Sequence, residues 1–241
     1  MSPASAKAPQ VVGQDWYREY YETKGADRNS LLHNPEVLYQ SLAQEAALVR
    51  ALQSIHPIEE TACVLDVGCG GGATLLTFLR LGFAADNLYG IDFQAERIAE
   101  ASEKCHGIHF VHGDATSLEF ATDTFDLVHE ATMFIHSVDE VLAHKIAEEM
   151  LRVTKPGGHI VLCDWRYAKP GGTAHRAVTQ KRIAGLFEVG RQTSRIGVLA
   201  GPLLPPIGRF LSWRLPAAYF LVSALLPFLV GQLTTVLRKH P

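Results

Sequence analysis

Four glycines follow a short apolar segment in the stretch VLDVGCGGGATLL, which runs from Val64 to Leu76. Apolar residues, then glycines, then the helical pattern LLTFLRL predict a strand, a tight turn and a helix. Glycines at such a turn adopt positive φ angles and let a ligand approach the backbone, while the first N–H groups of the helix face the ligand. The turn alone does not distinguish nucleotides, flavins and other ligands.

Three carboxylates narrow the choice of ligand. Asp92 ends the segment LYGID, 20 residues after Gly72, where an acid can accept hydrogen bonds from two ribose hydroxyls. Asp114 follows IHFVHG, where it can accept a hydrogen bond from an adenine amino group. Asp66 lies next to the glycines and would repel a pyrophosphate, whereas it would attract an ammonium or a sulfonium. An NAD-dependent dehydrogenase therefore stays open as an alternative, and a cationic nucleoside is favoured.

The segment HEATMFIHSVD supplies the candidate bases, because it follows a predicted strand, FDLV, at the same edge. His136 is the preferred base, since the reference pKa of histidine is about 6.5. Glu130 is the second candidate catalytic residue, and His129 is expected to be a packed strand residue. The two histidines are seven residues apart rather than four, so the segment does not match the H-E-x-x-H zinc pattern and we expect no metal.

Short apolar segments alternate with amphipathic ones from Cys63 to Trp165, which predicts a parallel sheet with helices on both faces. Right-handed crossovers then place the carboxyl ends of the strands, and hence the ligand, along one edge. Residues 137–140, SVDE, form a capping-box pattern for a helix that Lys155-Pro156-Gly157-Gly158 would end. After the fifth strand the alternation is expected to stop.

These motifs together resemble the class I S-adenosylmethionine-dependent methyltransferases over about residues 62–166. The resemblance rests on VLDVGCGGG, Asp92, the GDA of 113–115, the FDLV of 125–128 and LRVTKPGGHIVLCDW. It implies an α/β fold, a Rossmann-like, doubly wound seven-stranded sheet whose last strand is reversed, and Gln232–Lys239 is the candidate for that strand.

The resemblance also implies S-adenosyl-L-methionine as the cofactor. Asp66, Gly68 and Gly70 would surround its methionine moiety and Asp92 its ribose. Phe93 would pack on the adenine, with Asp114 at its edge. The full set of implied cofactor-binding residues is Asp66, Gly68, Cys69, Gly70, Asp92, Phe93, Gly113, Asp114, Ala115 and Glu130.

The expected organisation is one elaborated domain, because 241 residues with 47% hydrophobic content can bury one substantial core. Five segments make up this arrangement. They are a disordered N-terminus (1–10), a helical cap (11–60), the methyltransferase core (61–200), a hydrophobic helical insertion (201–231), and the final strand with the C-terminus (232–241).

The acceptor is predicted from the N-terminal segment, which resembles the cap of methyltransferases that build bacterial polysaccharides and other glycans. Tyr17, Tyr21, Arg28 and Asn29 would contact the substrate. The first interpretation is O-methylation of a hydroxyl of a saccharide or lipid-linked glycan, a reaction that needs a base. Two alternatives remain: methylation of a carbon or oxygen of a lipid or quinone, and a donor-binding module without catalysis.

The distribution of charged and apolar residues along the chain indicates where in the cell the protein is expected to work. Residues 1–165 carry 11 basic and 24 acidic side chains, whereas residues 166–241 carry 11 basic and one acidic. The basic half holds an apolar segment, Leu203 to Val230, in which Arg209 and Arg214 can meet anionic headgroups. Pro216 and Pro227 interrupt this segment, so a spanning helix is not preferred. We expect a cytoplasmic protein in peripheral contact with an anionic membrane and no nucleic-acid partner, and the sequence does not indicate an oligomeric state.

Overall fold

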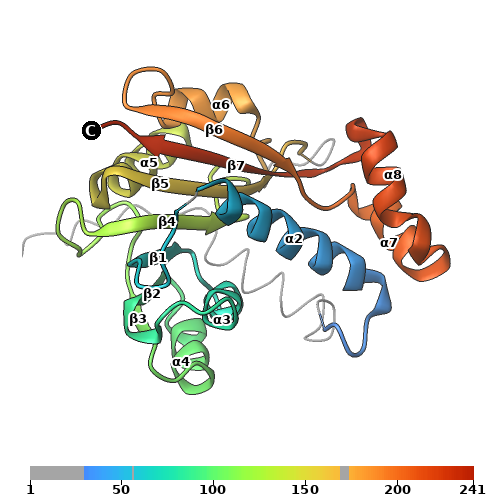
Figure 1. Cartoon of the computed structure of the whole chain (residues 1–241), viewed down its shortest axis with the longest axis horizontal. Helices are drawn as coiled ribbons and strands as arrows, with labels where there is room; N and C mark the ends of the chain where they lie inside the picture. The colour runs from blue at the N-terminus through green and yellow to red at the C-terminus, as the bar shows by residue number, and fades with distance from the viewer. Residues whose placement is uncertain (1–29, 56, 169–173) are drawn as a thin grey trace, which may run out of the picture.

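The computed structural model describes residues 30–55, 57–168 and 174–241, and its centre is a seven-stranded sheet with the strand order β3-β2-β1-β4-β5-β7-β6 (Figure 1). β7 is antiparallel to both of its neighbours, and the strands from β1 to β5 pair in parallel. The predicted α/β fold with a reversed last strand is therefore confirmed. The strands are β1 Val64–Val67, β2 Leu88–Asp92, β3 His109–His112, β4 Phe125–Ala131, β5 Thr154–Trp165, β6 Thr193–Ala200 and β7 Gln232–Lys239.

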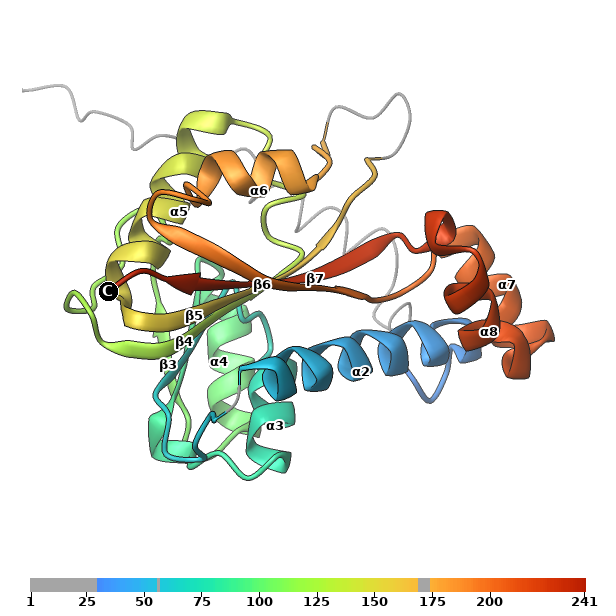
Figure 2. The ribbon, with the colours of Figure 1, turned by 45° about the horizontal axis from the view of Figure 1, so that its top comes forward.

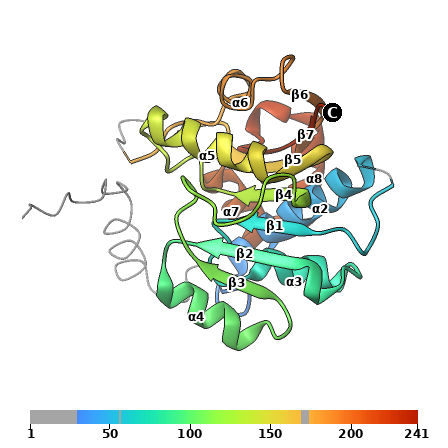
Figure 3. The ribbon, with the colours of Figure 1, turned by 90° about the vertical axis from the view of Figure 1, so that its left-hand side faces the viewer.

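Helices cover both faces of the sheet (Figure 2). One face carries α5 and α6, and the other carries α2, α3 and α4, while Figure 3 shows β1 to β4 side by side between these layers. The longer helices are α2 Leu38–Ser54, α3 Ala73–Arg80, α4 Ala95–Lys104, α5 Glu140–Val153, α6 Gln180–Leu186, α7 Pro205–Arg214 and α8 Tyr219–Leu225. Single 3-10 turns are η2 Pro35–Val37, η3 Ala85–Asn87, η4 Pro216–Ala218 and η5 Pro227–Leu229.

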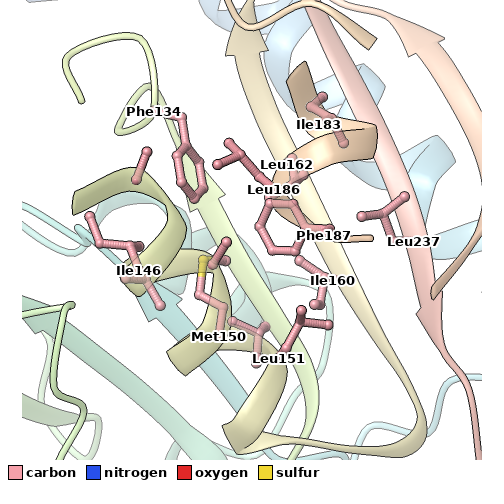
Figure 4. Close-up of a cluster of buried hydrophobic side chains, with 14 of the residues drawn as sticks. Phe134, Ile146, Met150, Leu151, Ile160, Leu162, Ile183, Leu186, Phe187 and Leu237 are labelled. Atoms are coloured by element: carbon pink, nitrogen blue, oxygen red, sulfur yellow. The ribbon is translucent and has the colours of Figure 1, made fainter. Parts of the chain in front are cut away.

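Each face of the sheet has its own hydrophobic core. Figure 4 shows the core under α5 and α6, where Met150 and Phe187 pack against β5 residues such as Ile160. The opposite core joins α3 to the sheet through Leu75 and Phe78, both fully buried. All four residues of β1 are buried, as expected for a strand covered on both faces.

The helix α2 lies in the segment predicted as a cap, yet it packs on the sheet. Leu48, Ala51 and Leu52 belong to the core on the α3 side, and α2 contacts β6, β7 and α7. Asn34 accepts a hydrogen bond from the N–H of Glu36 and so starts the turn that leads into α2. The described part of the predicted cap is thus a structural layer of the domain.

Two local expectations were wrong. The helix α5 is capped by Asp139, whose side chain accepts from the N–H groups of Val141 and Leu142, and not by Ser137. Residues 155–158 belong to β5 instead of forming a connecting turn, because Thr154 already pairs with Phe125 of β4. The chain therefore passes from α5 into β5 without a loop.

The alternation of helices and strands continues beyond β5, contrary to expectation. α6 has seven residues and β6 is the edge strand, with most of its side chains exposed or half-exposed. Such short or exposed elements carry little hydrophobic periodicity, so the residue pattern indicates them only weakly.

The hydrophobic insertion between β6 and β7 folds into η4, η5, α7 and α8, which lie at one end of the sheet (Figures 1 and 2). Tyr219 is fully buried there, and its hydroxyl accepts a hydrogen bond from the N–H of Leu203 at 3.2 Å. The uncharged stretch 215–237 is divided between short helical turns and β7. No helix within the described ranges is long and apolar enough to cross a membrane.

Candidate active site

A cavity of about 290 Å³ opens at the carboxyl ends of the central strands. Loops after β1, β2, β3 and β4 line it, together with the first turns of α5, so the predicted edge of the sheet is the one that is hollowed. Ten of the residues predicted from the sequence line the cavity: Asp66, Gly68, Cys69, Gly70, Asp92, Phe93, Gly113, Asp114, Ala115 and His136.

The glycine turn is tied to the end of β2. Gly68 and Gly70 have φ angles of 74° and 51°, which a side chain would strain. The N–H of Gly68 donates to the carbonyl oxygen of Ile91 at 2.8 Å, and the N–H of Gly70 donates to Oδ2 of Asp92 at 2.9 Å. Two N–H groups of the turn are thus used within the protein, so they are not available to bind a phosphate.

Asp92 also accepts a hydrogen bond from the N–H of Gln94 at 2.9 Å, through Oδ1. Burial raises the pKa of this carboxyl, whereas the two backbone hydrogen bonds and Arg97 lower it in part. Asp92 therefore connects the glycine turn to the start of α4 and still presents acceptor lone pairs to the cavity.

Asp66 forms a buried pair with His129 of the neighbouring strand β4. Oδ1 of Asp66 and Nδ1 of His129 are 2.7 Å apart, and both side chains are almost completely inaccessible. Burial would lower the pKa of His129, but the charge and the hydrogen bond of Asp66 raise it well above the ordinary value. His129 is thus the packed strand residue that was expected, and it fixes the orientation of Asp66 at the cavity.

Acidic groups dominate the polar lining. The four carboxylates of the described cavity lining belong to Asp66, Asp92, Asp114 and Asp139. Arg97 is the basic side chain that accompanies them, and it lies against Gly70, because a Cβ built at Gly70 would be 3.1 Å from Nη2 of Arg97. An excess of carboxylates favours a cationic ligand over a pyrophosphate, which weakens the dinucleotide alternative.

The apolar part of the cavity lining, which we call the apolar wall, comes mainly from α5 and its lead-in. Val138, Leu142 and Ile146 follow one another at four-residue spacing along α5 and its lead-in, and Ile91 and Met133 extend the same lining. The sequence pattern alone did not reveal that these side chains line a cavity. The signal was the four-residue spacing, but such spacing is equally typical of a helix that packs on the core.

His136, the preferred base, is among the residues that line the cavity. Its ring centroid is 4.8 Å from that of His175. Burial, and to a smaller extent the charge of His175, lowers the pKa of His136 to about 4. The imidazole is therefore neutral at pH 7, but it is a much weaker base than an ordinary histidine.

Glu130 does not lie with the other predicted site residues. It is completely buried and points to the same face of β4 as Val128, under α5 and α6, and it is not part of the cavity lining. Its Oε2 accepts a hydrogen bond from the N–H of Met133 at 3.1 Å, and burial raises its pKa to about 7. Glu130 thus meets the cavity lining through Met133, and its role in cofactor binding and catalysis stays a prediction.

Thr132 is a strained residue at the cavity that sequence patterns did not reveal. Its φ angle is 61°, which is unusual for a β-branched residue. Its N–H donates to the carbonyl oxygen of Cys163, and this bond holds the chain as it leaves β4. Strain of this kind costs about 1–3 kcal/mol and is concentrated at functional sites. The predicted substrate residues Tyr17, Tyr21, Arg28 and Asn29 lie outside the described residues.

Comparisons with known proteins agree with this geometry. Residues 64–158 match the family model described as a methyltransferase domain. The structure is similar to that of the 1,6-didemethyltoxoflavin-N1-methyltransferase of Burkholderia thailandensis, solved with S-adenosylhomocysteine, with a TM-score of 0.64 and 16% identity. That alignment covers 100% of this chain and 94% of the other.

Relatives of higher sequence identity carry names that indicate lipid acceptors. The chain is 36% identical to a demethylmenaquinone methyltransferase of Thermobifida fusca over 59% of its length and 58% of the relative's. It is also 36% identical to a 2-methyl-6-phytyl-1,4-hydroquinone methyltransferase of Synechocystis, over 68% of this chain and 52% of the relative. A sterol 24-C-methyltransferase of Aspergillus fumigatus is 31% identical over 54% and 34% of the two chains. The chain thus spans about half the length of these relatives.

The matched segment is a methyltransferase domain, and the sheet with its reversed last strand is the fold of the class I S-adenosylmethionine-dependent methyltransferases. A match to a methyltransferase domain indicates S-adenosylmethionine as the cofactor, and the Burkholderia thailandensis neighbour was solved with S-adenosylhomocysteine. The acid-lined cavity fits a ligand that carries a sulfonium and an ammonium group.

Proposed function

We propose that this protein transfers a methyl group from S-adenosylmethionine to an apolar ring acceptor of the quinone or sterol kind. The observation that carries the proposal is that one cavity is lined both by carboxylates at strand ends, Asp66, Asp92 and Asp114, and by apolar side chains of α5 and its lead-in. The carboxylates suit the charged donor, and the apolar wall of α5 suits an acceptor that has few polar groups.

The donor would lie along the loops that follow β1, β2 and β3. Asp66, held by His129, would attract the ammonium and the sulfonium, and Asp92 would accept hydrogen bonds from the ribose hydroxyls. Phe93 and Asp114 would contact the adenine from the ends of β2 and β3. S-adenosylmethionine supplies an electrophilic methyl group, and the tasks left to the chain are to align the acceptor and to exclude water.

The surroundings of His136 support an electron-rich carbon or ring hydroxyl more than a saccharide hydroxyl. A base works best when its pKa lies near the working pH. A pKa of about 4 makes His136 a poor proton acceptor for an aliphatic alcohol. The three relatives described above are named for quinone, hydroquinone and sterol acceptors, whereas a saccharide acceptor, our first interpretation of the sequence, has no comparable support.

An acceptor of this kind resides in a membrane, so we expect the protein to work at a membrane surface. The part of the chain that the structure describes contains no spanning helix, and peripheral contact is the arrangement that remains compatible with the proposal.

The decisive experiment offers the purified full chain methyl-deuterated S-adenosylmethionine with three acceptors: a reduced demethylated naphthoquinone, a sterol with an unsaturated side chain, and a saccharide. We expect the label in the quinol or the sterol, detected by mass spectrometry. Label in the saccharide alone would contradict the proposal. Calorimetric binding of the donor without transfer to any acceptor would instead indicate a donor-binding module.

Two variants test the apolar and the acidic parts of the cavity lining independently. Leu142→Ala should raise the KM of the acceptor and leave the affinity for S-adenosylmethionine unchanged, because Leu142 belongs to the apolar wall. Asp92→Ala should weaken the binding of S-adenosylmethionine and leave the KM of the acceptor unchanged, because Asp92 belongs to the donor side of the cavity. If Leu142→Ala changed only the affinity for the donor, the assignment of the two parts of the lining would be wrong.

A further inference from the structure

The surface of α7 and α8 exposes an unusual number of large apolar side chains. These helices and their 3-10 turns are held to the domain by Tyr219, Leu203, Leu211 and Val230, which form a small core of their own. The other large apolar side chains of these elements remain exposed to a considerable extent. The exposed set, which we call the α7–α8 apolar surface, consists of Phe210, Trp213, Leu215, Phe220, Leu221, Leu225, Leu226 and Phe228.

The exposure of this set is substantial. Leu225 and Phe228 are 68% and 61% exposed, and Trp213 is 55% exposed. Eight large apolar side chains within 19 residues form a larger cluster than scattered surface leucines do, and such clusters mark interaction sites.

The charged side chains within α7 and α8 themselves are basic. After Glu188 the sequence contains no acidic residue, while Arg209 and Arg214 lie within α7 itself. The guanidinium of Arg214 stacks over the ring of Trp213, with Cζ 3.9 Å from the ring centroid. An aromatic ring beside a cation suits the boundary between acyl chains and anionic headgroups.

The position of this surface relates it to the cavity. β6 is parallel to the central strands, because both β5 and β6 are antiparallel to β7. The insertion follows the carboxyl end of β6, so α7 and α8 lie at the same edge of the sheet as the cavity (Figures 1 and 2).

We propose that the α7–α8 apolar surface docks the protein on an anionic lipid bilayer, with Phe210, Trp213 and Leu225 inserted between the headgroups and Arg209 and Arg214 paired with lipid phosphates. The proposal deepens the proposed function, because docking would bring the protein to a membrane-resident acceptor. Only this link to the acceptor rests on the proposed function, and the docking itself does not. The elements are far too short to span a bilayer, so the contact is peripheral.

Two other occupants fit the surface less well. Residues 1–29 contain four basic and four acidic side chains, so this segment offers no net charge to complement the arginines. A second copy that met this surface with its own would bring Arg209 and Arg214 against like charges. A bilayer rich in anionic lipids complements both the apolar and the basic side chains.

The test is sedimentation of the full chain with vesicles that contain about 30 mol% phosphatidylglycerol, compared with pure phosphatidylcholine, at about 50 mM and 500 mM salt. We expect binding to the anionic vesicles at low salt and a loss of at least about tenfold in partition at high salt. The triple variant Phe210→Ser, Trp213→Ser, Leu225→Ser should lose binding under both conditions. The double variant Arg209→Gln, Arg214→Gln should lose the preference for anionic lipid.

The matched control replaces three exposed apolar residues of other elements: Leu32→Ser, Leu76→Ser and Val141→Ser. This control should bind vesicles as the unmodified chain does. Absence of binding by the unmodified chain, or an equal loss in the control, would overturn the proposal. A dimer in light scattering that the triple variant dissociates would also overturn it, because the surface would then join two copies.

A water-soluble quinol without a prenyl chain separates this proposal from the proposed function. If the triple variant fails to bind vesicles but still methylates this acceptor, docking and catalysis are distinct, as we expect. Vesicle binding by a chain that methylates no quinol or sterol would contradict the function alone. Methylation without vesicle binding by the unmodified chain would contradict the docking alone.

Discussion

At the scale of single residues, Asp92 has two tasks that the sequence did not separate. It was predicted as the ribose acceptor, and the structure shows that its carboxylate also accepts the N–H groups of Gly70 and Gln94. The residue therefore shapes the glycine turn before any ligand binds. A variant at this position removes both the acceptor for the ribose and the support for the turn.

We predict that Asp92→Ala weakens S-adenosylmethionine binding by about 2–4 kcal/mol, since each charge-assisted hydrogen bond is worth roughly 1.5–3 kcal/mol and such losses are not fully additive. Isothermal titration calorimetry measures this change. Glu96→Ala, on the exposed side of α4, is the control and should leave the affinity unchanged. An unchanged affinity in Asp92→Ala would reject the assignment of the donor site.

At the scale of elements, one buried tyrosine of the insertion connects it to the rest of the domain. Tyr219 accepts the N–H of Leu203, and its ring lies 5.6 Å from that of Tyr39, at the start of α2. Three segments that are distant in sequence, namely α2, the end of β6 and α8, thus meet at one side chain. Loss of this contact should loosen the whole insertion.

Tyr219→Phe should destabilise the protein by about 1–3 kcal/mol, because the buried N–H of Leu203 would lose its acceptor. Chemical denaturation followed by circular dichroism gives the free energy of unfolding. Tyr167→Phe provides the matched control, since the hydroxyl of Tyr167 donates to the carbonyl of Phe228 at an exposed position and its loss should cost much less. Equal effects of the two substitutions would show that burial does not decide the strength of the Tyr219 contact.

At the scale of the whole molecule, buried carboxyls make stability depend on pH. Glu130 and Asp164 lie completely buried at the ends of β4 and β5, and burial raises the pKa of both carboxyls. Oε1 of Glu130 has no hydrogen-bond partner among the described residues. A carboxyl with a raised pKa binds its proton more tightly in the folded than in the unfolded state. The stabilisation that protonated Glu130 contributes is complete below pH 4.5, which is the ordinary pKa of a glutamate. This stabilisation is lost as the pH rises towards about 7, the pKa of Glu130 in the folded protein.

Glu130→Gln should therefore flatten the fall in thermal stability between about pH 5 and pH 7.5, and the variant should gain on the unmodified chain by as much as ~3 kcal/mol at the upper end. Scanning calorimetry across this range tests the slope. Glu148→Gln replaces an exposed carboxylate of α5 and should leave the slope unchanged. A steeper fall in the Glu130→Gln variant would show that the carboxylate is stabilised, and not penalised, at this position.

The sequence by itself predicted every strand of the sheet except β6, and it placed the candidate donor residues at the edge where the cavity lies. These predictions use local features, namely the apolar periodicity, the glycine turn and the carboxylates at strand ends. Right-handed crossovers bring the carboxyl ends of the parallel strands to one edge of the sheet, so local features at those ends meet there. Gln232–Lys239 was placed correctly for the same reason, since its apolar and β-branched residues favour a buried strand.

Only the tertiary structure decided which side chains share a surface. His129 and Glu130 are consecutive residues of β4, and consecutive side chains of a strand point to opposite faces of the sheet. The side chain of His129 therefore lies against Asp66, whereas that of Glu130 lies on the face covered by α5. Burial then set the low pKa of His136 and the raised pKa of Glu130, because desolvation depends on neighbours from distant segments. The sequence likewise did not show what the apolar side chains of α5, α7 and α8 contact. An apolar stripe on a helix predicts burial, but it does not identify the surface that covers the stripe.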